Sequence, residues 1–209
     1  MDEFATANWF IKILDKELKI MKTGVGILIV SLAFLPLCAN ATPIDIDIYN
    51  DTTISSGEYG TVNIYDTPPE QTTVTMTGGQ VTDLYTYQSS MVNLVDGYIY
   101  GFYVTNSSMI DMLGGAIHHL MIGDSAIANL RGGQITYHIS ASGSSIFNIY
   151  GKEFYYIGDH LHGLWADNSS FDIWVRGPGT NEHVVLHEIP EPITILFLGL
   201  GYFLIKRRS

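Results

Sequence analysis

Histidine and carboxylate side chains are the groups in this chain best suited to acid–base or metal chemistry. Asp159, His160 and His162 bring three metal-binding side chains into four positions, and on an extended strand the two imidazoles would share one face. No further ligand follows at a spacing diagnostic of a metal site, and His118-His119 is interpreted as a surface pair. We therefore expect neither a metal nor any other cofactor.

Aspartates recur through the centre of the chain and could include the acid and base of a polysaccharide-cleaving enzyme. The candidates are Asp83, Asp96, Asp111 and Asp124. Such an enzyme needs acids that converge in one groove or a basic catalytic group, and the sequence contains no cluster of either kind. We therefore predict no catalytic residue and a protein that is not an enzyme. A polysaccharide lyase or hydrolase built on a β-helix is the alternative.

Tyrosine is concentrated in the same region, and two of these residues are candidate contacts for a glycan. Tyr98 and Tyr100 alternate as the outer face of a strand would, with Tyr85, Tyr87 and Tyr103 close by in the sequence. An outward tyrosine ring can stack on a sugar ring. Packing between tyrosines of neighbouring strands is the alternative interpretation.

An eighteen-residue repeat must position these side chains. Four segments define it, and they are VTMTGG, VNLVDG, IDMLGG and ANLRGG, beginning at Val74, Val92, Ile110 and Ala128. Apolar columns accompany them, namely Met76, Leu94, Met112 and Leu130, then Val81, Ile99, Ile117 and Ile135, then Leu84, Phe102 and Leu120. A further copy, IFNIYG at Ile146, is offset by one residue, and the offset is placed between Ile135 and Ile139.

Eighteen residues are too few for a helix pair or a propeller blade, but they suit one coil of a β-solenoid. Val74 and Met76 alternate with Thr75, so they can point inward, and the glycine pair that follows fits a corner with positive φ. We therefore predict an all-β, single-stack β-helix over residues 42–188, a right-handed β-solenoid with irregular covers at its ends. A glycine-rich β-sandwich is the alternative.

The central region is strongly acidic. From Thr42 to Glu191, three basic residues (Arg131, Lys152 and Arg176) stand against seventeen acidic ones, a net charge of −14 with neutral histidines. Phosphate binding requires the opposite sign, so we expect no nucleic acid partner. An acidic surface favours solubility, divalent cations or repulsion from anionic polymers.

The C-terminal segment, residues 189–209, has three parts in order. Pro190-Glu191-Pro192 precedes an uncharged apolar run at 193–205, which predicts a membrane helix that is short against a hydrocarbon core of roughly 30 Å. The basic end consists of Lys206, Arg207 and Arg208. Cations beside an apolar run hold that end on the cytoplasmic side, so the domain before it would lie outside.

These three parts resemble the PEP-CTERM sorting tail, over about a tenth of the chain. The resemblance implies that an exosortase recognises Pro190-Glu191-Pro192 and cleaves nearby, in Gram-negative bacteria that make exopolysaccharide. It also implies transient anchoring in the inner membrane, followed by release or attachment at the cell surface or in the extracellular space.

The N-terminal part carries a matching export signal. Residues 21–41 begin with Met21, continue through an apolar stretch and end in Ala39-Asn40-Ala41, which predicts a Sec signal peptide cleaved after Ala41. Residues 1–20 are interpreted as an upstream extension from a mis-assigned start codon, with a long n-region as the alternative. Cys38 is the only cysteine, so cleavage would leave neither a disulfide nor a thiolate site.

Together these patterns favour a non-enzymatic surface or extracellular-matrix protein associated with exopolysaccharide and biofilm. Its expected partners are the Sec machinery, signal peptidase, exosortase and the inner membrane during export, and exopolysaccharide afterwards. A glycan-binding adhesin is an alternative that would require an exposed aromatic strip. The enzyme alternative would require acids converging in one groove.

Overall fold

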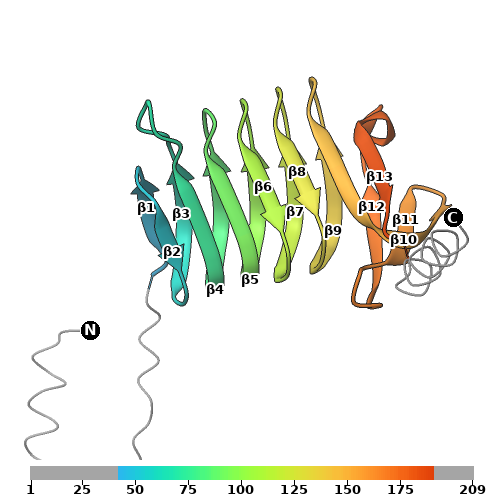
Figure 1. Ribbon diagram of the computed structural model, residues 1–209. Coiled ribbons are helices and arrows are strands. Elements are labelled where there is room, and N and C mark those ends of the chain that lie inside the picture. The colour runs from blue at the N-terminus through green and yellow to red at the C-terminus, as the bar shows by residue number, and fades with distance from the viewer. Residues whose placement is uncertain (1–41, 191–209) are drawn as a thin grey trace, which may run out of the picture. The chain divides into compact units, whose positions relative to one another are not determined.

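The computed structural model describes residues 42–190, which form a β-solenoid (Figure 1). Thirteen strands belong to one hydrogen-bonded sheet that winds around a single core. The strands are β1 (Ile44–Ile48), β2 (Thr52–Ile54), β3 (Glu58–Ile64), β4 (Thr73–Thr86), β5 (Met91–Val104), β6 (Met109–Met112), β7 (Ala116–Ile122), β8 (Ile127–Leu130), β9 (Gln134–Ala141), β10 (Ile146–Ile157), β11 (His160–Leu164), β12 (Ser170–Val175) and β13 (Val184–Glu188). A short 3₁₀ helix, η1 (Thr180–His183), precedes the last strand. The predicted all-β solenoid is confirmed, and the β-sandwich alternative is wrong.

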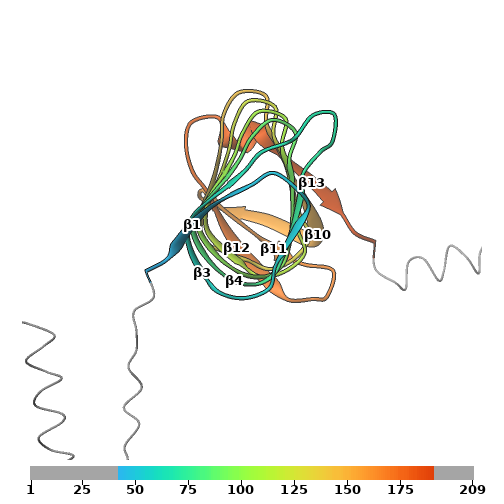
Figure 2. The same ribbon diagram turned by 90° about the vertical axis from the view of Figure 1, so that its left-hand side faces the viewer.

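Each regular coil contributes one strand segment to each side of a flattened stack, which the view along the stack makes visible (Figure 2). The first face consists of β2, the first parts of β4 and β5, then β6, β8, the first part of β10, and β13, all parallel. The second face begins with β1, β3, the second parts of β4 and β5, β7 and β9, also parallel.

The eighteen-residue register predicted from the sequence is the register observed. Four residues of one column are Cα partners in successive strands, and each is at most 1% exposed: Met76, Leu94, Met112 and Leu130. The members of the other two predicted columns are also buried. Because each apolar side chain lies next to its equivalent in the following coil, the core is continuous along the stack.

The predicted one-residue offset is located in β9. Ile117 pairs with Ile135, eighteen positions later, whereas Leu120 pairs with Ile139, nineteen positions later. Two residues of β9 therefore lie opposite the single residue His118, which is the arrangement of a β-bulge. The next strand, β10, keeps the longer spacing, because Ile146 pairs with Ile127, nineteen positions earlier.

The glycine pairs form the corner that joins the first face to the second. The second glycine of each corner has a positive φ, which is 82° at Gly79, 111° at Gly97, 68° at Gly115 and 81° at Gly133. Asp96 replaces the first glycine of one corner, and its carboxylate accepts a hydrogen bond of 2.7 Å from the N–H of Gly97. The predicted role of these glycines is confirmed.

Replacing Gly115 by alanine is expected to lower the free energy of unfolding by about 2 kcal/mol. The new Cβ would lie 2.8 Å from the carbonyl oxygen of Gly97, at a φ of +68°. Gly158→Ala is the matched control, because its φ is +59° and no other atom lies within 4 Å of its Cβ. Urea unfolding of both variants measures the difference, and equal losses would mean that close coil packing at this corner contributes nothing.

The opposite corner is held by side chains that bond to the preceding coil. The side-chain oxygen of Asn106 accepts a hydrogen bond from the N–H of Gln88, and Asp124 accepts one from the N–H of Asn106, each at 2.9 Å. Serine pairs at 89–90, 107–108 and 144–145 lie at this corner, where the second serine of each pair is buried, and Ser90 and Ser108 donate to carbonyls three residues before them. The serine pairs therefore mark a corner whose buried polar groups are satisfied.

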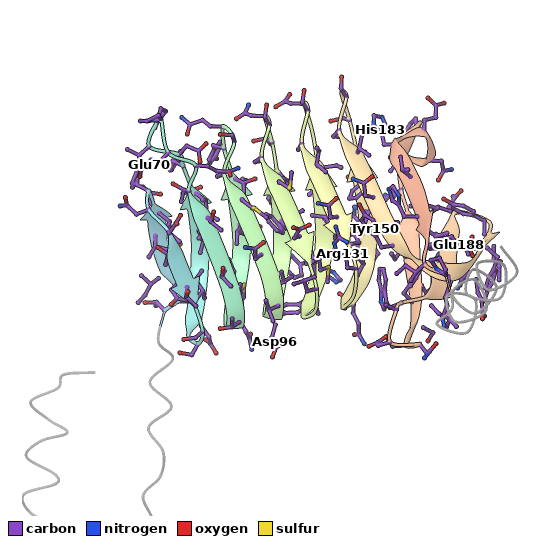
Figure 3. The ribbon with its side chains drawn as sticks, in the orientation of Figure 1. Glu70, Asp96, Arg131, Tyr150, His183 and Glu188 are labelled. Carbon is purple, nitrogen blue, oxygen red and sulfur yellow. The ribbon has the colours of Figure 1, made fainter. Side chains whose placement is uncertain are left out.

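A polar ladder runs along the outside of the first face. Asn129 donates to the carboxylate of Asp111 at 2.7 Å, and Asn148 donates to Asn129 at 2.9 Å. Beside this ladder, the guanidinium of Arg131 lies over the ring of Tyr150, with Cζ 4.0 Å from the centroid (Figure 3). Arg131 is therefore occupied by contacts on the first face.

The C-terminal end of the stack departs from the repeat. β10 leaves the first face and pairs antiparallel with β11, which pairs antiparallel with β12. β12 then joins the second face beside β9 through Trp174 and Val175. Trp165 packs on Phe171 with ring centroids 4.2 Å apart, and its Nε1 donates to the carbonyl oxygen of Gly133 at 3.0 Å. This antiparallel segment covers the end of the core.

Several predictions concern residues outside the described range. They are the extension at 1–20, the signal peptide at 21–41 with Ala39 and Ala41, and the tail from Glu191 onward with Pro192, Lys206, Arg207 and Arg208. Pro190 is the last described residue, and it is exposed. Within residues 42–190, no helix has the length and apolar character needed to cross a membrane.

Candidate functional site

Aromatic and imidazole rings form a continuous cluster at the second face, and His138 is its buried member. We call this cluster the aromatic strip, and its members are Tyr100, His118, His119, Tyr137, His138, Trp174 and His160. Ring centroids lie 4.8 Å apart between Tyr100 and His118, and 5.2 Å apart between His118 and Tyr137. Tyr137 meets the edge of Trp174 at 5.2 Å, and the ring of His160 lies parallel to Trp174 at 6.0 Å.

The coil register explains the first half of the strip. Tyr100 and His118 occupy the same column of neighbouring coils. The bulge in β9 then places two residues opposite His118, which contacts Thr136 through a hydrogen bond of 2.9 Å and stacks on Tyr137. Tyr100 is 47% exposed and Tyr137 is 38% exposed, so both rings can contact a ligand.

The second half of the strip comes from strands outside the repeat. β12 places Trp174 beside His138 as its Cα partner, and β11 places His160 opposite Trp174. The guanidinium of Arg176 lies over the Trp174 ring, with Cζ 5.4 Å from the centroid. The indole is therefore held between its strand neighbours and a cation.

His119 and His138 form a close imidazole pair within the strip. Their Nδ1 atoms are 3.2 Å apart, so one ring donates a hydrogen bond and the other accepts it. Burial lowers the pKa of His138 below its ordinary value of 6.5, and the nearby charges of His119 and Arg176 act in the same direction. Burial, His118 and Arg176 likewise lower the pKa of His119. The pair is therefore neutral at neutral pH.

Acidification is expected to destabilise the protein through this pair. Because both folded-state pKa values lie below the unfolded value of 6.5, the unfolded chain binds more protons. The stability that the neutral histidine pair contributes to the folded state is fully present above the unfolded-state pKa of 6.5. It is lost as the pH falls from there through the folded-state pKa values. The melting temperature should therefore drop between about pH 7 and pH 5, and His138→Phe should reduce that drop. His187→Gln, in β13 and outside the strip, is the control, and identical pH profiles for wild type and His138→Phe would contradict this account.

A cleft of about 520 Å³ opens beside the strip, between the start of β9 and the pair β11–β12. It exists because β9 and β12 are paired at His138 and Ile139 but not at the residues before them. The polar side chains that line it are Gln134, Thr136, Glu153, His162, Ser170 and Asp172. Tyr155 stacks on His162 at one wall, with ring centroids 5.0 Å apart.

Two carboxylates line this cleft, and neither was predicted from the sequence. Asp172 Oδ1 lies 2.7 Å from Nδ1 of His160 and 3.9 Å from Nδ1 of His162. Glu153 sits in a bulge of β10 with a φ of +57°. Residues other than glycine rarely adopt this backbone conformation, and such strain is often retained at functional sites.

The two predicted glycan-facing tyrosines have different surroundings. Tyr100 belongs to the aromatic strip, whereas Tyr98 is half-buried and lines, with Tyr100 and Tyr59, a separate hollow of about 260 Å³. Tyr85 and Tyr103 stack on each other with centroids 4.6 Å apart. Tyr85 and Tyr103 therefore fit the alternative interpretation, in which tyrosines of neighbouring strands pack on each other.

The predicted acid and metal candidates are not brought into one site. Asp111 lies on the first face, Asp83 on the second, and Asp96 and Asp124 lie at opposite corners. His160 and His162 do share one side of β11, as predicted, and both approach Asp172. In the part of the chain that the structure describes, no group of three metal-binding side chains is arranged to hold a metal ion.

The sequence did not lead us to predict that these aromatic and imidazole rings lie together in one strip. His118-His119 was interpreted as a surface pair, although its partners are Tyr137 and His138 in the next coil. The offset between Ile135 and Ile139 was visible in the sequence, and applying it would have aligned these residues. The arrival of Trp174 through β12 has no such signal, because β12 lies beyond the regular repeat.

Comparison of the chain with protein-family models, curated proteins and solved structures finds no match. The site must therefore be interpreted from its own chemistry. Exposed rings in a row, followed by a cleft lined with hydroxyl, amide and carboxylate groups, can pack on the apolar faces of a ligand and hydrogen-bond its polar edges.

Proposed function

We propose that this protein is a non-enzymatic surface or extracellular-matrix protein that binds exopolysaccharide through the aromatic strip. The observation that carries the proposal is the row of stacked rings formed by Tyr100, His118 and Tyr137, in which both tyrosines are exposed and His118 is half-buried between them. Because these rings stack on one another, the row presents hydroxyl and imidazole groups at its edge, which can hydrogen-bond to sugar hydroxyls, and leaves the outer ring faces for sugar C–H groups. Because the rings project from a stacked sheet, little conformational entropy is lost when they bind a polymer.

A polysaccharide hydrolase or lyase is the second candidate, and one observation favours it. Glu153 and Asp172 line the same cleft, which is the convergence of acids that such an enzyme requires. A carboxyl that acts as general acid needs an environment that disfavours its ionised form, however, and both residues are exposed to solvent. We therefore favour binding over cleavage.

The export of the protein is part of the same proposal. A signal peptide at 21–41 would direct secretion, and the resemblance of residues 189–209 to a PEP-CTERM tail supports anchoring by a helix at 193–205 and processing by an exosortase. The domain would then reach the cell surface or the matrix. We also propose that the coils are right-handed, the hand that parallel β connections nearly always adopt.

The export proposal predicts a doubly processed protein. The intact mass of material from the native host should correspond to a chain that begins near Thr42 and lacks Lys206, Arg207 and Arg208. Deletion of the exosortase should leave a membrane-bound form that retains the tail. A surface form that still carries Arg208 would contradict the processing step.

A glycan array probed with the purified protein tests the binding proposal. Binding to at least one bacterial polysaccharide is the expected result, and absence of binding across neutral, cationic and anionic polymers would contradict it. Preference for glycans foreign to the producing bacterium would favour the alternative, a glycan-binding adhesin.

A further inference from the structure

The cleft beside the aromatic strip is acidic. Glu153 and Asp172 both line it, and of the described residues in its lining none is a lysine or an arginine. Arg131 is engaged with Tyr150 on the first face, and Arg176 with Trp174. A ligand that enters the cleft therefore meets two carboxylates and no lysine or arginine among the lining residues, while Asp172 Oδ1 also lies 2.7 Å from Nδ1 of His160.

The walls of the cleft also supply a stacking surface and hydrogen-bonding groups. Tyr155 is 55% exposed and stacks one face of its ring on His162 with an interplanar angle of 13°, so the ring is held in place with its other face available to a sugar. Gln134, Thr136 and Ser170 add amide and hydroxyl groups to the lining. A volume of about 520 Å³ falls within the range of small-molecule sites and can hold one or two sugar units.

Anionic polymers fit this cleft poorly. Between residues 42 and 190 the protein has three basic and sixteen acidic residues, so the surroundings of the cleft repel polyuronates and other acidic chains. A protonated amine would instead form charge-assisted hydrogen bonds with carboxylates, which are stronger than those between neutral groups.

We propose that the cleft binds a hexosamine unit with a free, protonated amino group, so that the preferred polymer is a de-N-acetylated aminoglycan. This inference rests on the proposed function, because it names the sugar class for a protein that binds polysaccharide. The amine pairs with Glu153 and Asp172, the sugar ring lies against Tyr155, and the polymer continues along the aromatic strip.

Titration calorimetry with glucosamine oligomers tests the proposal on the purified full chain. The affinity for these oligomers should exceed that for fully N-acetylated oligomers of equal length by about tenfold, which corresponds to one charge-assisted contact. Glu153→Gln and Asp172→Asn should each abolish most of this preference, and added salt should weaken it. Oligouronates should not bind.

Glu70→Gln is the matched control, because it removes the same charge from an exposed loop between β3 and β4 (Figure 3). It should leave the preference for glucosamine oligomers unchanged. If Glu70→Gln and Glu153→Gln lower the preference equally, the preference arises from the overall charge of the protein, and the assignment to the cleft is overturned. Equal affinity for acetylated and free-amine oligomers would also overturn it while leaving the proposed function intact. Absence of binding to every polysaccharide would overturn both.

Discussion

Replacing Leu94 by alanine is expected to lower the free energy of unfolding by about 2–5 kcal/mol. Leu94 is fully buried and lies between Met76 and Met112 in the central apolar column. Its neighbours belong to strands that are hydrogen-bonded on both sides, so they cannot move together easily to fill the cavity. The loss therefore combines the transfer of the side chain to water with an unfilled cavity.

Val95→Ala is the matched control for this experiment. Val95 directly follows Leu94 in the chain, but its side chain is 44% exposed. Its effect should stay within about 0.5 kcal/mol, as is usual for surface positions. Urea or thermal unfolding of the purified variants measures both values. A loss below about 1 kcal/mol for Leu94→Ala would contradict a tightly packed solenoid core.

The double substitution Tyr100→Ala and Tyr137→Ala is expected to lower the affinity for polysaccharide about a hundredfold. Each exposed ring contributes roughly a tenfold effect when it stacks on a sugar, about 1.4 kcal/mol. Both side chains also pack on His118, so the variant is expected to lose some stability, and binding is measured at a temperature where circular dichroism shows it to be folded. Equilibrium binding to the polysaccharide selected on the array measures the effect.

Tyr49→Ala combined with Tyr156→Ala is the control for the strip. These two tyrosines are 49% and 45% exposed, close to the values of the strip residues, but they lie outside the strip. The control pair should retain the affinity of the wild type. If both double variants lose affinity equally, the strip is not the binding surface.

The regular part of the fold was predictable because each coil repeats the same physical requirements. Inward apolar residues recur at fixed positions, as Met76 and Leu94 illustrate, and a corner glycine with positive φ recurs after them, as at Gly79. The offset of one residue was placed correctly before Ile139, since buried columns tolerate no change of face.

The candidate site was less predictable, because it depends on contacts that the repeat does not encode. Tyr100 was identified from its outward position in a strand. Trp174 and Asp172 reach the second face through β12, which returns to the stack after an antiparallel excursion. Glu153 owes its place in the cleft to a bulge in β10 with a positive φ, and no local residue pattern marks that bulge.

The central claim is that the protein binds polysaccharide without cleaving it, and a co-sedimentation experiment tests this directly. The purified full chain is incubated with each candidate polymer, and the bound protein and the polymer length are then measured in the same sample. The account predicts that the protein sediments with at least one polysaccharide whose chain length stays constant. Failure to sediment with any polymer, or a polymer that shortens with wild type but not with Glu153→Gln, would contradict it.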